Sequence, residues 1–199
     1  MKLKFILLIV FFLALPSKIS AQNIKFGEAK GLFLSLGIGP RIPVGEFAKS
    51  HNLGIGFDVG VSYTDNFYIP VFFYGKIGYQ HYPGLQNYYK ISELSSISTN
   101  IICFDAGVRF YLPPIVKNIV VVMPIIEAGA SYYFSSTFNQ FKLSAGKLNF
   151  ADDSSKFGFH IAGGVSVFLL DVMVHYTYLQ KSQNMAVDMR LRIPLYLKM

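Results

Sequence analysis

The clearest pattern in this chain is a strict alternation of apolar with small or polar residues between positions 157 and 197. In Phe157–Val167 the odd positions are apolar except for Gly163, while the even positions are Gly, His, Ala, Gly and Ser. The same pattern returns in Asp171–Tyr178 and in Val187–Leu195. A period of two over about ten residues predicts β-strands with one apolar and one polar face. Segments of this length are what a transmembrane β-barrel requires.

Five earlier segments show the same alternation: Gly31–Gly39, Leu53–Thr64, Phe67–Tyr82, Asn100–Leu112 and Ile119–Phe134. The sequence therefore predicts an all-β protein, an eight-stranded antiparallel up-and-down transmembrane β-barrel. Long loops at 40–52, 83–99, 135–156 and 180–184 alternate with short turns near Asp65, Pro113 and Leu169. That asymmetry is typical of outer-membrane barrels, whose short turns are periplasmic.

Three prolines, Pro70, Pro124 and Pro194, fall inside the predicted strands. Proline cannot donate a hydrogen bond to the ladder, so bulges or displaced strand ends are expected at these positions.

The size of the residues indicates which face of the barrel is outside. A soluble lipocalin-like barrel would show the same alternation with its apolar face inward. One face here carries almost only Leu, Ile, Val, Phe and Tyr, which is too much volume for the interior of eight strands. The large face is therefore predicted to contact lipid. Aromatic girdles at the two membrane interfaces are expected from Tyr63, Phe67 and Tyr68 at one end and from Tyr79, Tyr82, Tyr132, Tyr133 and Tyr178 at the other.

The N-terminus has the pattern of a cleaved secretory signal peptide. Met1–Lys4 is basic, Phe5–Leu15 is apolar, and Ile19–Ala21 ends in a small residue before Gln22. The apolar run of 11 residues is too short to span a bilayer as a helix. We expect residues 1–21 to be removed after export through the Sec pathway, leaving one barrel domain at 22–199.

Composition supports a membrane barrel and excludes some functions. The chain is 52% hydrophobic and 15% charged, and an exported apolar chain can hide its backbone in lipid by closing a sheet. Loss of Lys2, Lys4 and Lys18 with the signal peptide lowers the net charge from +7 to +4. Without a basic run, nucleic acid is not an expected partner. The single cysteine, Cys103, cannot form an internal disulfide.

The polar face of the predicted strands carries a set of charges that would share the barrel lumen. Its members are Asp58, Lys76, Asp105, Arg109, Glu127, Asp171, Asp188, Arg190 and Arg192, with His160 and His175 nearby. Buried charges must pair, so we expect a polar plug of ion pairs that fills a closed barrel. The alternative is a conducting pore with a charged filter, which needs a wider lumen than eight strands usually leave.

The predicted loops carry an excess of basic residues. Arg41, Lys49, Lys90, Lys142, Lys147, Lys156 and Lys181 outnumber the loop acids Glu46, Glu93, Asp152 and Asp153 by three. These bases could contact outer-membrane lipid, including lipopolysaccharide phosphates, or could simply be solvated.

Catalytic chemistry is not expected. A turn near Leu169 would place Asp171 opposite Phe168 and far from His160, and Ser166 with His175 lacks an orienting carboxylate. The spacing of the residues suggests no metal site and no cofactor.

The segments Gly37–Phe47 and Gly54–Tyr63 resemble the outer membrane protein β-barrel domain family of Bacteroidetes-type bacteria, which includes the PorT-like proteins. The shared features are a first strand, a Pro-x-Gly-acid-Phe loop and a Gly-rich second strand that ends in Tyr. The resemblance implies a small eight-stranded barrel inserted by the outer-membrane assembly machinery. The terminal Met199 stands where a terminal aromatic residue is common in such barrels.

Together these features predict an integral outer-membrane barrel of a Gram-negative bacterium. Its role is expected to be structural, or to be interaction with protein partners through extracellular loops. A narrow porin-like channel for small solutes is the alternative, and a lipid-modifying enzyme is a less favoured one.

Overall fold

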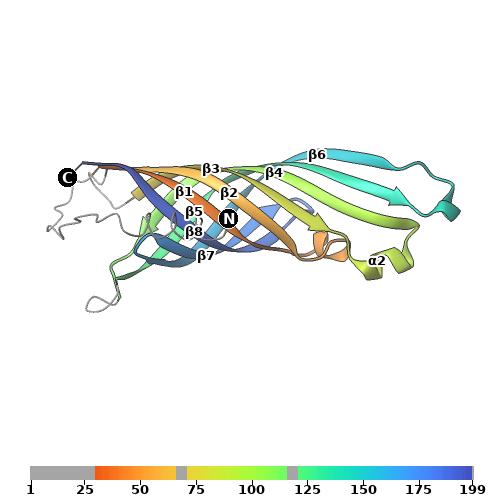
Figure 1. The fold of residues 1–199 in the computed structure, drawn as a ribbon, viewed down its shortest axis with the longest axis horizontal. Coiled ribbons are helices and arrows are strands. Elements are labelled where there is room, and N and C mark those ends of the chain that lie inside the picture. Colours follow the sequence, from red (N-terminus) through yellow and green to blue (C-terminus); the bar gives the residue numbers. More distant parts are fainter. Residues whose placement is uncertain (1–29, 66–70, 116–120, 199) are drawn as a thin grey trace, which may run out of the picture.

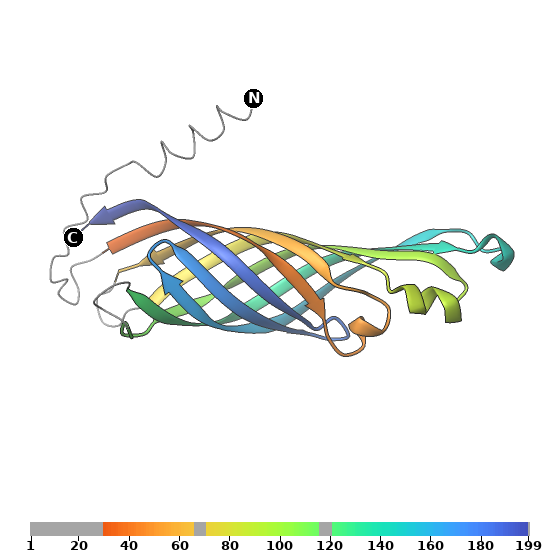
Figure 2. The ribbon, with the colours of Figure 1, turned by 60° about the horizontal axis from the view of Figure 1, so that its bottom comes forward.

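Eight antiparallel strands form a closed barrel in the computed structural model, which describes residues 30–65, 71–115 and 121–198 (Figures 1 and 2). The strands are β1 (Lys30–Pro43), β2 (Gly54–Thr64), β3 (Val71–Pro83), β4 (Leu94–Tyr111), β5 (Val122–Phe141), β6 (Phe150–Val167), β7 (Leu170–Leu179) and β8 (Asn184–Lys198). Each strand pairs with its neighbours in sequence, and β8 closes the ring on β1. The predicted all-β up-and-down topology is confirmed. The predicted signal peptide at 1–21 lies outside the described residues.

The apolar face of the barrel points outward. Along β2 all eleven positions alternate between buried and exposed. The exposed set includes Phe57, at 54% exposure, and Val61, whereas Asp58 and Ser62 face the lumen. The lumen thus receives the small and polar residues, as the sequence predicts.

Three strands continue well past their predicted ends. β4 begins at Leu94 rather than Asn100, β5 ends at Phe141 rather than Phe134, and β6 begins at Phe150 rather than Phe157. The predicted loop at 135–156 is therefore too long, because only 142–149 connects β5 to β6, and the one at 83–99 is too long in the same way. Outward apolar residues stop near the predicted ends, but the β5–β6 ladder continues to the pair Asn139 and Phe150 with mostly polar side chains on both faces. This three-stranded extension projects beyond the other strands in Figure 1.

Short helices lie in the long connections. They are η1 (Phe47–Lys49), α2 (Gln86–Ile91) and η2 (Leu143–Ala145). The Nζ of Lys142 donates hydrogen bonds to the carbonyl oxygens of Tyr89, at 2.7 Å, and Ser92, at 2.8 Å, which ties α2 to the end of β5. No helix in the described ranges is long and apolar enough to cross a bilayer.

The prolines behave in different ways. At Pro194 the β1–β8 register shifts, because Phe33 pairs with Pro194 but Leu32 pairs with Tyr196, so a bulge forms as expected. Pro124 instead pairs with Val165 in an unbroken β5–β6 register, but β5 begins at Val122 rather than at the predicted Ile119, so a displaced strand end replaces the bulge there. Pro70 lies outside the described residues.

Candidate functional site

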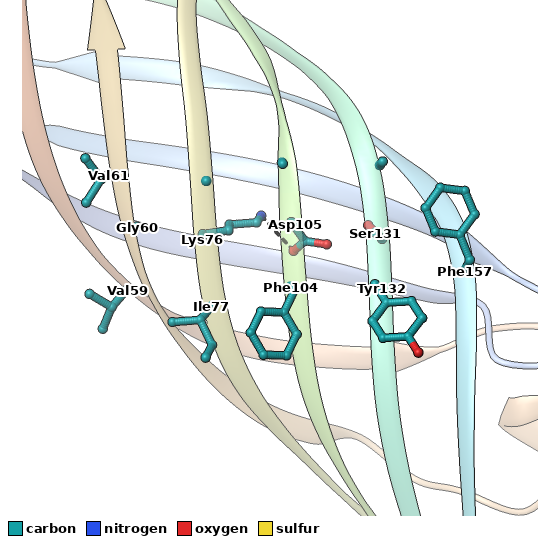
Figure 3. Close-up of a pocket in the computed structure, with 13 residues that line it drawn as sticks. Val59, Gly60, Val61, Lys76, Ile77, Phe104, Asp105, Ser131, Tyr132 and Phe157 are labelled. Atoms are coloured by element: carbon teal, nitrogen blue, oxygen red, sulfur yellow. Dashed lines mark ion pairs between the residues drawn. The ribbon is translucent and has the colours of Figure 1, made fainter.

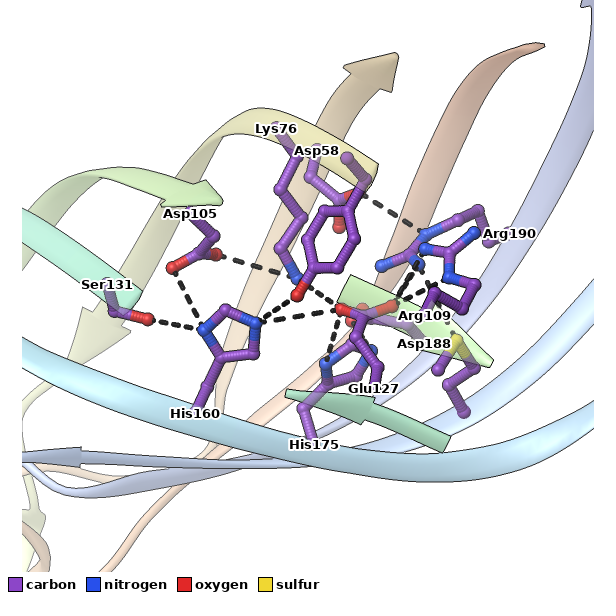
Figure 4. A network of polar contacts seen from close by, with 12 residues as sticks. Asp58, Lys76, Asp105, Arg109, Glu127, Ser131, His160, His175, Asp188 and Arg190 are labelled. Atoms are coloured by element: carbon purple, nitrogen blue, oxygen red, sulfur yellow. Dashed lines mark hydrogen bonds and ion pairs between the residues drawn. The ribbon is translucent and has the colours of Figure 1, made fainter. Parts of the chain in front are cut away.

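The nine charged residues predicted for the lumen meet inside the barrel, and Figure 4 labels all of them except Asp171 and Arg192. They come from six strands, and the exposed fraction of each of these side chains is at most 9%. We call these nine residues, together with Arg41 and the two lumen histidines, the lumen network.

Glu127 on β5 is the centre of the lumen network. Its Oε2 accepts hydrogen bonds from Arg109 Nε at 2.9 Å and lies 2.8 Å from Arg109 Nη2. Lys76 Nζ is 3.6 Å from Oε1, and Arg190 Nη1 is 3.5 Å from Oε2. Three cations therefore surround one carboxylate whose side chain is fully buried. Such clustering offsets the cost of removing the charges from water.

The remaining acids link the centre to the two ends of the lumen. Lys76 Nζ also lies 3.5 Å from Asp105, and Arg190 Nε lies 3.6 Å from Asp58. Asp171 is 3.9 Å from both Arg109 Nη1 and Arg192 Nη2. It stands opposite Ser166 in the ladder, so the expectation that it would face Phe168 is wrong.

Arg41 belongs to the lumen network, and its assignment to a loop is wrong. Strand β1 continues to Pro43, and the Arg41 side chain is buried where it binds Asp188 and lies 3.6 Å from Asp58. Its position continues the inward series of Ser35 and Gly37, so the alternation could have revealed it. With Arg41, five cations face five carboxylates among the described residues.

His160 sits among groups that resemble a catalytic set but are arranged differently. Its Nε2 shares a hydrogen bond with the Tyr74 hydroxyl, and Ser131 Oγ lies 2.7 Å from Nδ1. Asp105 Oδ1 is 3.7 Å from the same Nδ1. In a Ser-His-acid unit the serine and the acid occupy opposite ring nitrogens, and the serine must reach substrate. Ser131 is 1% exposed, so this geometry is that of a buried polar contact.

The long-loop end of the lumen is closed by an apolar seal. Phe47 of η1 is 7% exposed and packs edge-on against Tyr82, with ring centroids 4.9 Å apart. Beneath it lie four other buried residues, Ile101, Cys103, Tyr133 and Leu179. Tyr82 and Tyr133 were expected in the outer girdle, and that is wrong because both side chains point inward.

His51 fastens the loop that carries Phe47. Its Nε2 lies 2.7 Å from Thr99 Oγ1 and its Nδ1 lies 2.8 Å from Ser50 Oγ. Burial lowers the pKa of His51 to about 4, because the imidazolium form loses its hydration. The neutral side chain thus joins the β1–β2 connection to β4.

The short-turn end is closed by a cation and aromatic rings. The Arg192 guanidinium lies 4.7 Å from the ring centre of Tyr111 and 5.5 Å from that of Phe33. Phe72 contacts both rings, at centroid distances of 4.9 Å and 5.8 Å. Between the two seals, a cavity of about 20 Å³ beside Asp58 and Asp188 has room for one water molecule.

The same architecture is found in a solved structure, that of Neisserial surface protein A (NspA). It superimposes with a TM-score of 0.54 at 14% sequence identity, over 83% of this chain and 97% of NspA. The chain has the fold of a small outer-membrane β-barrel. This fold implies a place in the bacterial outer membrane.

Two other solved barrels are similar at lower scores. Ail, the attachment invasion locus protein of Yersinia pestis, has a TM-score of 0.49 at 13% identity, over 84% of this chain and 99% of Ail. The N-terminal β-barrel domain of Pseudomonas aeruginosa OprF has a TM-score of 0.47 at 10% identity, over 84% of this chain and all of that domain.

Sequence comparison adds no family assignment. No family model matches the chain, and no curated protein matches it. The similarity that is shown is therefore to small eight-stranded outer-membrane barrels in general, and membership of the PorT-like family remains a prediction. Within the described residues, no group of three or more His, Cys, Asp or Glu side chains could hold a metal ion.

Proposed function

We propose that this protein is a closed, non-conducting outer-membrane barrel that presents a rigid platform to a macromolecular partner outside the cell. In this proposal the signal peptide directs Sec export, and the outer-membrane assembly machinery inserts the barrel with its short turns in the periplasm. The observation that carries the proposal is the double seal of a lumen filled with paired charges.

The seals argue against the alternative of a narrow solute channel. A solute would have to displace Phe47 at one end and Arg192 at the other. Between them it would have to separate the ion pairs around Glu127, which is 0% exposed. Breaking a buried ion pair leaves an uncompensated charge, which costs about 3–5 kcal/mol. Every solute that passed through the lumen would have to break these ion pairs again.

The platform is the extension formed by β4, β5 and β6. β6 pairs with β5 as far as Phe150, but its pairing with β7 begins only at Gly158 and Leu179. The described part of β6 at 150–156 therefore has one open hydrogen-bonding edge, and most of its side chains are exposed. Together with α2, which Lys142 braces, this gives a protein partner a preformed surface.

Fewer than the seven bases assigned to the loops are free to contact lipid phosphates. Arg41 is in the lumen, Lys147 pairs with Glu93, and Lys156 donates a hydrogen bond to Ser182 Oγ. Lys49, Lys90 and Lys181 are exposed and are the candidates for phosphate contact.

Single-channel recording in planar bilayers tests the sealed lumen. The folded protein, verified by its heat-dependent gel mobility, should give no steps above the background while a general porin in the same apparatus conducts. Regular steps from the wild-type barrel would overturn the proposal in favour of the channel. A photo-cross-linker at Asp152, an exposed residue of the platform, should capture a surface partner in intact cells, and the same group at lipid-facing Ile161 should not.

A further inference from the structure

The outward wall of the barrel contains an open apolar groove of about 620 Å³ (Figure 3). Its floor contains Gly75, Ala106 and Ala130, which lie side by side because they are ladder partners across β3, β4 and β5. Larger apolar side chains border it, and these are Val59, Val61, Ile77, Phe104, Tyr132 and Phe157. Lys76 and Asp105, on the same strands, point to the lumen side.

The groove adjoins a second hollow that is partly polar. This hollow measures about 520 Å³ and has Tyr79, Ile102 and Phe134 at the end nearer the groove. Asn100, which accepts a hydrogen bond from the Tyr79 hydroxyl at 2.8 Å, lines it together with Ser136, Asp153 and three further serines. We call this the polar hollow.

The centres of the two hollows differ in depth by about the thickness of one lipid leaflet. Ala106 in the groove and Asn100 in the polar hollow are six residues apart on β4, which is about 20 Å along a strand. At a tilt of about 45° this becomes about 14 Å of depth, close to half of a hydrocarbon core of about 30 Å. The groove thus lies near mid-membrane and the polar hollow near the interface.

We propose that the groove holds one acyl chain of a membrane lipid whose uncharged, hydroxyl-bearing head group occupies the polar hollow. The lipid-facing wall must be covered by something apolar, because an unfilled depression loses dispersion contacts. A flexible acyl chain can follow the small residues of the groove floor. The polar hollow next to the groove favours an occupant that also carries a polar group. Asp153 is the one charged residue among the nine that line the hollow, so an anionic head group would be repelled.

Two glycines provide a matched pair of variants for the chain site. A Cβ added at Gly75 meets no atom within 4 Å, and one added at Gly163 meets only a backbone oxygen at 3.9 Å. Both residues are exposed on the outward wall, but Gly163 does not line the groove. Gly75→Leu should fill the floor, while Gly163→Leu adds the same side chain elsewhere on the wall.

Native mass spectrometry of the folded barrel, released from micelles, measures the bound lipid. The probes are monoglucosyl diacylglycerol and phosphatidylglycerol with identical saturated chains. The wild type should retain one glucolipid, and Gly75→Leu should weaken its retention by about tenfold or more, equivalent to about 1.4 kcal/mol. Gly163→Leu should match the wild type.

A third variant tests the head group. Asp153→Asn should narrow the preference for the glucolipid over phosphatidylglycerol without changing the effect of Gly75→Leu. Equal lipid retention by Gly75→Leu and Gly163→Leu would overturn the groove site. Loss of a dimer peak on Gly75→Leu, without loss of lipid, would show that a second copy of the chain occupies the groove and would also overturn the proposal.

Discussion

Tyr74 on β3 and His160 on β6 share a hydrogen bond across the lumen, although two strands lie between them. The ladder partners at this level are Gly107 on β4 and Gly129 on β5. Neither has a side chain, so the Tyr74 ring and the imidazole can approach over them. A Cβ on Gly107 would lie 2.2 Å from the carbonyl oxygen of Ala128, so the close approach of the two strands also requires glycine.

Replacing the Tyr74 hydroxyl tests the importance of this contact. Tyr74→Phe removes one partner of His160 Nε2 in a buried site and should lower the free energy of unfolding by about 1–3 kcal/mol. Urea unfolding of the barrel in lipid vesicles measures the change. Tyr178→Phe, at a position 43% exposed on the outward wall, is the control and should change stability by less than about 0.5 kcal/mol. Equal losses of stability in the two variants would contradict a stabilising hydrogen bond between Tyr74 and His160.

Neutralising the centre of the lumen network should be more costly. Glu127→Gln leaves Lys76, Arg109 and Arg190 without their shared carboxylate, and a loss of about 3–5 kcal/mol is expected. The same unfolding experiment applies. Glu93→Gln removes the exposed ion pair with Lys147 and should cost at most about 1 kcal/mol. A small effect of Glu127→Gln would show that the network is hydrated rather than sealed.

Cys103 is a native reporter of the apolar seal. It is the single cysteine of the chain, is 4% exposed, and belongs to the buried cluster that includes Phe47. A water-soluble maleimide should label it only after unfolding. Phe47→Ala should raise the labelling rate of the folded barrel by at least about tenfold, which corresponds to about 1.4 kcal/mol of easier opening. Rapid labelling of the wild type would mean that the seal is open.

The loop carrying Phe47 should loosen as the medium becomes acidic. The pKa of His51 is about 4 in the folded loop, below its usual value of 6.5, so the unfolded loop binds the proton more tightly. The stabilising effect is complete above about pH 6.5 and is lost as the pH falls toward 4. The protection factor of the amides at residues 44–53, which is the intrinsic exchange rate at each pH divided by the observed rate, should therefore fall over this range. His51→Asn should flatten the profile, which separates His51 from carboxylates that titrate lower.

The membrane-spanning part of this fold could be predicted because lipid enforces the pattern. Every outward position from Ile102 to Phe110 must be compatible with hydrocarbon, so the period of two is unbroken there. From Asn100 to Leu94 the β4–β5 hydrogen-bond ladder continues, but both faces of the sheet meet water there, so apolar and polar residues no longer need to alternate. The sequence pattern therefore predicts strand ends near the edge of the apolar wall, whereas the hydrogen-bonded strands extend further.

The seals were harder to foresee. Arg41 and Tyr82 stand at positions where the alternation places side chains in the lumen. Pro40 and Pro43 beside Arg41 favour a loop, however, and a tyrosine near a strand end favours an interfacial girdle. Phe47 reaches Tyr82 across 35 positions of sequence. No local pattern indicates that contact, because it depends on how η1 folds back over the lumen.

The height of the apolar wall has a consequence for the membrane itself. On β4 and at the residue that follows it, the outward residues run from Ile102 to Leu112, ten positions apart, which is about 33 Å along an extended chain and about 23 Å of depth at a tilt of about 45°. A typical hydrocarbon core is about 30 Å thick, so such a bilayer would have to thin around the barrel. This hydrophobic mismatch is smaller in the bacterial outer membrane, which is thinner than average. The height of the apolar wall therefore matches the thinner outer membrane better than a bilayer of typical thickness.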